Sequence, residues 1–267
     1  MNAALSEPAV EMSAVSQSFD EMAVLEDFSL TVNRGEFVSL VGPSGCGKST
    51  ILNLIAGFAH PTRGTVRAGG RPVTHPGPDR GVCFQQAALF PWLSVVDNVT
   101  FGPRARHELD PQRRARAVRM LQEFGLGEFL RHRPAQLSGG MQQRAAIARV
   151  LVNEPDVLLM DEPFGALDAQ TRLRMQRFLT EVQDEFGCTI VFITHDIDEA
   201  LLMSDRVLVL SRRPAHVVDE IVVEAPRPRT PDYLLTEDFR RHKARAFTAL
   251  ESLSAERSLG DRGDEHA

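Results

Sequence analysis

Short apolar runs alternate with helical patterns along most of the chain. The run Phe37–Val41 precedes a glycine-rich loop, and residues 49–56 then follow a helical pattern that Gly57 is expected to end. Three further apolar runs are bounded by turn or helix signals and predict buried parallel strands at 157–160, 189–194 and 207–210. Strands that alternate with helices predict an α/β fold, in which ligands bind at the carboxyl ends of the parallel strands.

Helices are predicted before and after the strand at 157–160. Helical periodicity dominates from about residue 91 to 153, which predicts an inserted helical subdomain. Further along, Met175, Leu179 and Val182 recur at i, i+4 and i+7, and Gly187 supplies a stop. This second pattern predicts a crossover helix that leads to the next strand.

Prolines interrupt the regular pattern after residue 225. The segment 226–231 holds three of them, so we expect a main domain over 1–225 and a C-terminal extension over 226–267. Within the extension, a polar helix is expected from residue 232 to about 253, followed by a frayed tail.

Composition narrows the range of functions. The net charge is −6 and the pI about 5.8, so the broad basic face typical of nucleic-acid binding is not expected, and we expect no nucleic-acid partner. No apolar stretch approaches the roughly 18 to 20 residues that cross a bilayer, so the chain is not expected to span a membrane unaided. Cys46, Cys83 and Cys188 are widely separated, which predicts neither a disulfide framework nor a zinc site and suits a reducing cytoplasm.

The glycine-rich loop fits the phosphate-binding pattern G-x-x-x-x-G-K-[ST]. Its residues are Gly42, Pro43, Ser44, Gly45, Cys46, Gly47, Lys48 and Ser49, with Thr50 placed in the same nucleotide site. Backbone N–H groups of such a loop surround phosphate oxygens, Lys48 neutralises the β and γ phosphates, and the Ser49 hydroxyl is a ligand for Mg²⁺. An ordinary glycine-rich turn is the alternative, but the position between a strand and a helix favours ATP binding.

Two carboxylates end the strand at 157–160. Asp161 is expected to hold Mg²⁺ through its water shell, and Glu162 to polarise the water that attacks the γ-phosphate. Carboxylates beside a core are costly unless they serve a cation or a reaction. A solvated strand end is the alternative for this pair when it is considered alone.

The segment 137–144, Leu-Ser-Gly-Gly-Met-Gln-Gln-Arg, predicts a second anion site. Ser138 caps a helix whose apolar face includes Met141, so its hydroxyl and the amides of Gly139 and Gly140 can bind an anion. A bare helix cap is the alternative. The whole segment resembles the signature LSGGQ-x-x-R of the ABC (ATP-binding cassette) family, with Met141 where Gln is commonest.

The resemblance to ABC proteins extends over residues 13–224 and implies further roles. The fold would be a P-loop NTPase (RecA-like) core with a parallel sheet, a small antiparallel β part and the inserted helical subdomain. Gln85 matches the glutamine that contacts Mg²⁺ or the attacking water, Asp168 lies in the segment that crosses the dimer interface, and His195 matches the histidine that contacts the γ-phosphate. Phe19 lies where the family stacks an aromatic ring on adenine, the alternative being a core Phe. Two copies would pair head to tail, with each ATP between the phosphate loop of one and the signature of the other.

Several segments look like the nitrate, sulfonate and taurine importer branch of the family, among them 76–82 and 89–92. The resemblance implies a bacterial uptake system, with the chain bound peripherally at the cytoplasmic face of the inner membrane. Its partners would be permease subunits and, indirectly, an extracytoplasmic substrate-binding protein. Phe90, Pro91 and Trp92 would lie near the permease, where Trp92 suits an apolar docking surface, local core packing being the alternative.

The cargo is open among taurine, other sulfonates, nitrate and similar solutes. The main alternative function is a soluble non-transport ABC ATPase, such as an assembly or repair factor. A kinase of the P-loop group does not explain the signature or His195.

Overall fold

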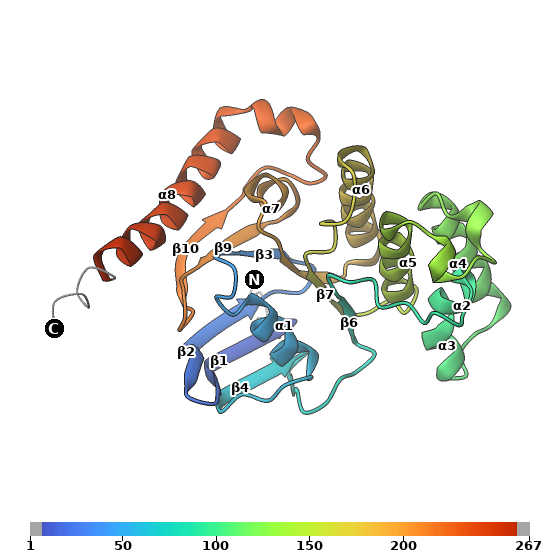
Figure 1. Cartoon of the computed structure of the whole chain (residues 1–267), viewed down its shortest axis with the longest axis horizontal. Helices are drawn as coiled ribbons and strands as arrows, with labels where there is room; N and C mark the ends of the chain where they lie inside the picture. The colour runs from blue at the N-terminus through green and yellow to red at the C-terminus, as the bar shows by residue number, and fades with distance from the viewer. Residues whose placement is uncertain (1–6, 261–267) are drawn as a thin grey trace, which may run out of the picture. The chain divides into compact units, whose positions relative to one another are not determined.

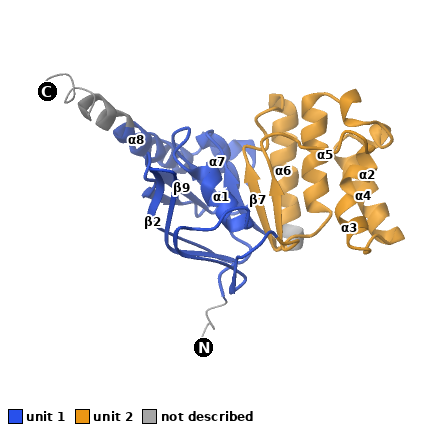
Figure 2. Ribbon diagram, turned by 60° about the horizontal axis from the view of Figure 1, so that its bottom comes forward, with its two compact units in different colours: residues 1–76, 189–267 blue, residues 77–188 orange. Residues whose placement is uncertain are grey.

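The computed structural model of the chain describes residues 7–260, without the side chains of residues 184–186 and 254–260. It forms two compact units, residues 1–76 with 189–267 and residues 77–188, which Figure 2 colours separately. The second unit holds the helical segment predicted at about 91–153 together with the strand and the crossover helix that follow it.

The first unit contains strands of two sheets (Figure 1). One sheet is antiparallel, in the order β2-β1-β4-β5, and is made of β1 (Val10–Phe19), β2 (Met22–Val32), β4 (Arg63–Ala68) and β5 (Arg71–Pro72). The other strands of this unit, in the order β10-β9-β3-β8, are β3 (Phe37–Val41), β8 (Thr189–Ile193), β9 (Arg206–Leu210) and β10 (Val217–Val222). β3 is parallel to β8 and β9, which confirms three predicted strands, whereas β10 is antiparallel to β9 and was not predicted.

Three α-helices pack on these strands. α1 (Lys48–Ala56) ends at Gly57, whose φ of 81° is the left-handed conformation predicted for the stop. α7 (Ile197–Met203) packs on β3 and β9, and α8 (Glu237–Gly260) packs along β9 and β10. α8 begins later than the predicted residue 232, because a 3₁₀ turn (Pro231–Leu235) comes first, and it continues through residue 260. The frayed tail was predicted over 255–267. This is wrong for residues 255–260, which belong to α8, and residues 261–267 lie outside the described residues.

Arg229 fixes the extension to α7. Its guanidinium donates hydrogen bonds to the carbonyls of Leu201, Leu202 and Ser204, at 3.2, 3.3 and 2.7 Å. These carbonyls lie where a helix end leaves acceptors without an intrahelical partner. The guanidinium also lies over the Tyr233 ring, 5.5 Å from its centroid, and desolvation by burial lowers the pKa of Arg229. The extension is therefore packed into the first unit.

The second unit consists of two parallel strands and a set of helices. The strands are β6 (Arg80–Cys83) and β7 (Val157–Asp161), of which only β7 was predicted. The α-helices are α2 (Val95–Val99), α3 (Phe101–Ala105), α4 (Pro111–Glu123), α5 (Gly139–Leu151) and α6 (Ala169–Phe186), with short 3₁₀ turns at Gly127–Phe129 and Pro134–Gln136. α6 ends at Gly187 in the left-handed conformation, as the crossover pattern predicts.

The three cysteines are buried and reduced. Burial raises the pKa of the Cys83 thiol to about 12, so this thiol is protonated at neutral pH. None of these three cysteines forms a disulfide.

Candidate functional site

The phosphate loop joins β3 to α1 in the first unit. Gly45 and Gly47 have φ values of 74° and 125°, a region in which side chains are strained. A Cβ at Gly42 would lie 2.9 Å from the Leu210 carbonyl oxygen. The glycines at these three positions are therefore required by the backbone path of the loop.

The phosphate loop carries the positive charge of Lys48, and no acidic side chain among the described residues pairs with it. Lys48 is only 8% exposed, and its Nζ donates to the Gly42 and Pro43 carbonyls at 2.8 and 2.9 Å. Among the described residues it forms no ion pair. α1 has no side-chain cap and no acidic residue in its first turn, so its N-terminal amides also lack an acidic side-chain partner. A buried ammonium beside a helix N-terminus with no acidic cap fits a phosphate chain.

The other members of the predicted loop differ in exposure. Ser44 and Ser49 are exposed, Pro43 and Thr50 are half-buried, and Cys46 is buried with its Sγ 3.9 Å from Lys48 Nζ. The exposed Ser49 hydroxyl suits the predicted metal contact, and Cys46 packs as a spacer in the loop.

His195 follows β8 at the edge of the sheet where the phosphate loop follows β3. The two strands are parallel, with Leu40 paired to Ile193, so both segments leave their strands at the carboxyl end. The turn is fixed on both sides of His195: the Thr194 hydroxyl bonds Glu199 at 2.5 Å, and Asp196 accepts from the N–H groups of Asp198 and Glu199. His195 itself is exposed at this edge.

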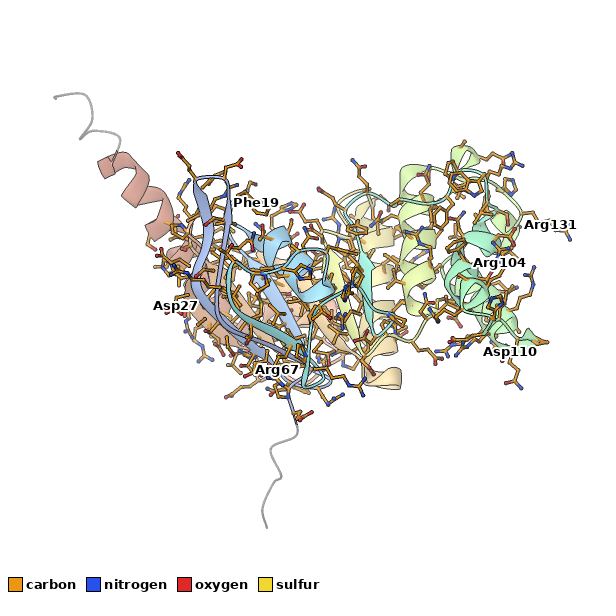
Figure 3. All side chains as sticks on the ribbon, turned by 90° about the horizontal axis from the view of Figure 1, so that it is seen from below. Phe19, Asp27, Arg67, Arg104, Asp110 and Arg131 are labelled. Carbon is orange, nitrogen blue, oxygen red and sulfur yellow. The ribbon has the colours of Figure 1, made fainter. Side chains whose placement is uncertain are left out.

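Phe19 ends β1 at the hairpin with β2 (Figure 3), opposite Met22 in the register. It is 49% exposed. The interpretation of Phe19 as a core residue is therefore wrong, and its ring is open to stacking.

The second unit brings Gln85 and Glu162 together. β6 and β7 are parallel, with Cys83 opposite Met160, so the residues after both strands meet at one edge. Gln85 Nε2 lies 3.4 Å from Glu162 Oε2, and Asp161 ends β7 directly before it. Glu162 has a φ of 44°, which is uncommon for a residue with a side chain and costs on the order of 1 kcal/mol. Backbone strain of this kind clusters at functional sites.

The signature segment forms the N-terminus of α5. The Ser138 hydroxyl accepts a hydrogen bond from Met141 N–H at 3.3 Å, which confirms the predicted cap. A Cβ at Gly139 would meet nothing within 4 Å, and one at Gly140 would approach Leu167 at 3.3 Å. The amides at this helix start therefore lie beside residues 166–167 and next to open space.

Asp168 caps α6 just after that segment. Its carboxylate accepts from Thr171 N–H at 3.0 Å, and hydrogen bonds from Thr171 hold the pKa of Asp168 below its usual value. It is therefore ionised at neutral pH. The structure gives Asp168 a capping role, and its predicted part at a dimer interface stays a prediction.

Three residues that hold the segment after β6 were not predicted. The buried Gln143 donates to the Phe84 carbonyl at 3.1 Å, Asn98 makes hydrogen bonds with both Phe90 N–H and Phe90 carbonyl, and Arg149 donates to the Ala88 carbonyl at 2.8 Å. Gln143 and Asn98 are polar residues at buried positions of helices. A polar side chain within an apolar helix face was the signal that could have revealed Gln143 and Asn98.

No cluster of three His, Cys, Asp or Glu that could hold a metal occurs among residues 7–260 with described side chains. Mg²⁺ held by one or two protein ligands together with phosphates and water does not need such a cluster. The assignment of Ser49, Asp161 and Gln85 as Mg²⁺ ligands stays a prediction.

Comparison with known proteins identifies the family. The family model described as ABC transporter matches residues 25–165, more than half of the chain. The chain is 44% identical over 258 residues to the aliphatic sulfonates import ATP-binding protein SsuB 2 of Burkholderia lata, covering 97% of this chain and 90% of that one. The chain belongs to the ABC transporter family. This ABC ATPase is also 45% identical over 246 residues to the nitrate transport protein NasD of Klebsiella oxytoca, covering 89% and 94% of the two chains.

A solved structure confirms the fold class of this ABC ATPase. A dimeric ATP-binding cassette in a post-hydrolysis state, bound to ADP and Pi, matches with a TM-score of 0.73 and 33% identity, over 81% of this chain and all of that one. The α/β P-loop fold, the ATPase activity and the resemblance to the nitrate and sulfonate branch are therefore confirmed.

Proposed function

We propose that this ABC ATPase is the ATP-hydrolysing subunit of a bacterial importer for a small solute, which is taurine, another sulfonate or nitrate. The observation that carries the proposal is the identity of 44% across nearly the whole length of an aliphatic sulfonate import ATP-binding protein. A non-transport ABC ATPase is not favoured, because both relatives described above are named as transport proteins.

ATP binding is assigned to the first unit and to the signature of a second copy. Phe19 stacks on the adenine, the loop from Gly42 to Thr50 binds the phosphates through its amides, and Lys48 neutralises them. Ser138, Gly139 and Gly140 of the second copy bind the γ-phosphate from the other side, and Asp168 lies at the interface. The dimeric state of the matching ADP-bound cassette supports this arrangement.

Hydrolysis is assigned to the carboxylates after β7. Glu162 accepts a proton from the attacking water, Gln85 orients Glu162 through the 3.4 Å contact, and His195 contacts the γ-phosphate. Mg²⁺, held by Ser49, Gln85 and Asp161, would neutralise charge on the phosphates. Loss of the γ-phosphate removes the group that both copies bind, so the dimer opens and the permease returns to its resting orientation.

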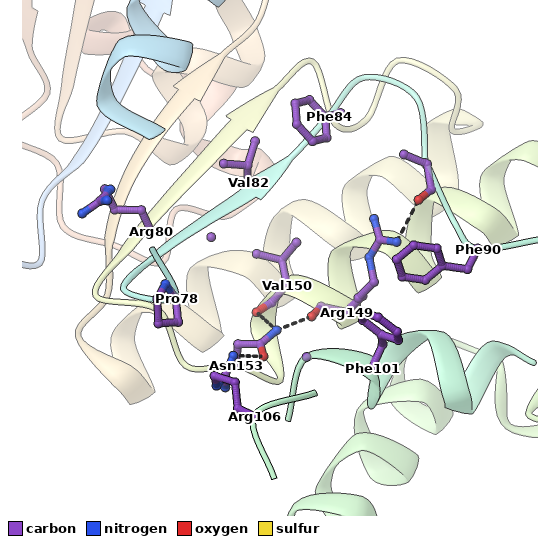
Figure 4. A pocket seen from close by; sticks show the side chains of 13 residues that line it. Pro78, Arg80, Val82, Phe84, Phe90, Phe101, Arg106, Arg149, Val150 and Asn153 are labelled. Carbon is purple, nitrogen blue, oxygen red and sulfur yellow. Dashed lines mark hydrogen bonds between the residues drawn. The ribbon is translucent and has the colours of Figure 1, made fainter. Parts of the chain in front are cut away.

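A hollow in the second unit supports a permease docking site. It has a volume of about 380 Å³ and is lined by aromatic and basic side chains, among them Phe84, Phe90, Phe101 and Arg149 (Figure 4). Phe90 contacts Phe101 with ring centroids 4.5 Å apart, and the Arg149 guanidinium lies 5.6 Å from the Phe90 centroid. An exposed apolar surface of this kind suits a partner segment.

Trp92 extends this surface, with its ring centroid 5.6 Å from that of Phe90. It is 67% exposed, so the interpretation of Trp92 as local core packing is wrong. None of the helices within residues 7–260 has the length and apolar character needed to cross a bilayer. We assign the chain to the cytoplasmic face of the inner membrane, held there by the permease, with the substrate-binding protein on the other side.

The docking surface is tested by purifying the tagged ATPase from detergent-solubilised membranes and measuring how much permease is recovered with it. Trp92→Ala is expected to reduce this recovery by about tenfold, because loss of an aromatic anchor that an interface buries typically weakens the interface by that much or more. ATP affinity should not change. Phe247→Ala, which removes a 47% exposed ring from α8, is the control and should leave recovery unchanged. Equal recovery of the permease by wild type and Trp92→Ala would contradict the docking surface. Recovery of soluble partners in place of a permease would contradict the importer.

A further inference from the structure

The turn between β9 and β10, residues 211–216, carries two consecutive arginines and is held by several hydrogen bonds. The N–H of Ser211 donates to the His216 carbonyl at 2.9 Å, and the N–H of His216 donates to the Ser211 hydroxyl at 2.9 Å. The N–H of Ala215 donates to the Val24 carbonyl at 2.8 Å, which joins the turn to β2. An ordered turn therefore presents the side chains of Arg212 and Arg213.

Arg213 lies against the phosphate loop. Its Nε donates to the Gly45 carbonyl, and one terminal nitrogen lies 2.9 Å from the point where a Cβ of Gly45 would stand. Its other terminal nitrogen lies 2.7 Å from Met22 Sδ. Met22 pairs with Phe19 in the hairpin register. The guanidinium thus bridges the loop expected to hold phosphates and the hairpin expected to hold the base.

Arg213 differs in its charge partners from Arg206 and Arg245 of the first unit. Arg206 is paired with Glu36 and Glu220, and Arg245 with Asp219. Within the described part of the chain Arg213 forms no ion pair, and its side chain is exposed. A planar guanidinium pairs with phosphate oxygens through two parallel hydrogen bonds. A small movement of the exposed Arg213 side chain would exchange the Gly45 carbonyl for a charged phosphate oxygen as its hydrogen-bond acceptor.

Arg212 connects the same turn to the C-terminal extension. Its Nε donates to the carbonyl of Leu253 in α8 at 3.2 Å. Leu253 is buried at 6% exposure, so this part of α8 is packed against the unit. The neighbouring arginines therefore join two elements: one holds the turn on α8 and the other contacts the phosphate loop.

We propose that Arg213 is a further nucleotide-binding residue whose guanidinium contacts the phosphates of a nucleoside triphosphate held in the loop 42–49. Arg212 is a positioning residue that fixes the turn on α8. The inference rests on the proposed function of the loop. Because the contact is made to phosphate, its contribution to affinity rises with the number of phosphates and is small for a nucleoside monophosphate.

The test compares the dissociation constants of ATP, ADP and AMP for wild type and variants, measured by titration calorimetry. Divalent cations are left out so that no ATP is hydrolysed during the measurement. Arg213→Ala should weaken ATP binding by about tenfold, since a hydrogen bond to a charged group commonly contributes that much. AMP binding should change by less than about twofold. Arg213→Lys keeps the positive charge but loses the planar guanidinium that can donate two parallel hydrogen bonds, so an ATP affinity between those of wild type and Arg213→Ala is expected.

Arg67→Ala is the matched control. Arg67 is exposed in the same unit and donates to one backbone carbonyl, that of Gly70, at 3.1 Å, so its removal changes net charge equally. Its ATP affinity should equal that of wild type. An unchanged or tighter ATP affinity in Arg213→Ala, or equal weakening in Arg67→Ala, would overturn the inference.

Lys48→Ala separates failure of this inference from failure of the proposed function. If Lys48→Ala weakens ATP binding and Arg213→Ala does not, the phosphate loop stands and the role of Arg213 is wrong. If neither variant weakens it, the proposed nucleotide site itself is wrong. Arg212→Ala should weaken ATP binding less than Arg213→Ala does, and an equal or larger loss would assign the contact to Arg212.

Discussion

Glu162→Gln is expected to lower ATP turnover by about a hundredfold to ten thousandfold, the contribution that a general base commonly makes. Glutamine has nearly the same shape as glutamate but cannot accept the proton of the attacking water. It can still bond Gln85, which lies 3.4 Å from Glu162 in the wild-type chain. ATP affinity should therefore persist, and an ATP-bound dimer should accumulate. Phosphate release and light scattering measure the two effects.

Glu128→Gln is the control for this variant. Glu128 is exposed in the same unit, on a 3₁₀ turn, and its replacement makes the same change of charge and shape. Its turnover should match wild type. If Glu162→Gln hydrolyses ATP within about twofold of wild type, the general-base assignment is wrong, because that role requires at least a hundredfold.

Lys48→Ala is expected to weaken ATP binding by about tenfold to a hundredfold, the usual range for a lost hydrogen bond to a charged group. Lys48 is buried beside the N-terminus of α1 and forms no ion pair among the described residues, so its charge is available to phosphate. Equilibrium binding of ATP to the isolated chain measures the loss.

Lys243→Ala is the control, because it removes the other lysine of the chain from α8, where Lys243 pairs with Asp198. Its ATP affinity should be that of wild type. If Lys48→Ala binds ATP as tightly as wild type does, the assignment of the phosphate loop as the ATP-binding site is contradicted.

The buried parallel strands and the helix ends could be predicted from the sequence. β3, β7, β8 and β9 are almost fully buried, so they are continuous apolar runs bounded by turns. Gly57 and Gly187 end helices in the conformation that glycine favours.

The antiparallel strands could not be placed from the pattern. β1 pairs with β2 through three register shifts, which break the strict alternation of apolar and polar residues that reveals a half-buried strand. The parallel strand β6 was missed for a different reason: it is only partly buried along its first three residues, so it has no apolar run. The resemblance to the ABC family supplied the antiparallel part, without its boundaries.

Some residues of the candidate site could be predicted from the sequence and others could not. Loop glycines, Lys48 and the carboxylates after β7 follow motifs whose spacing is fixed by chemistry. Gln143 and Arg149 instead bond backbone carbonyls far away in the chain, at separations of 59 residues for Phe84 and 61 for Ala88. Asn98 bonds the backbone of Phe90, eight residues away. Such contacts depend on the folded backbone, so a sequence pattern does not reveal them.

The central claim is that each catalytic pocket is completed by two copies of the chain. The most direct measurement is a crystal structure of the Glu162→Gln variant loaded with ATP. We expect the Ser138 hydroxyl of one copy within hydrogen-bonding distance, about 3 Å, of the γ-phosphate bound by Lys48 of the other. A structure in which both phosphate loops hold ATP and each Ser138 lies far from every γ-phosphate would contradict the account.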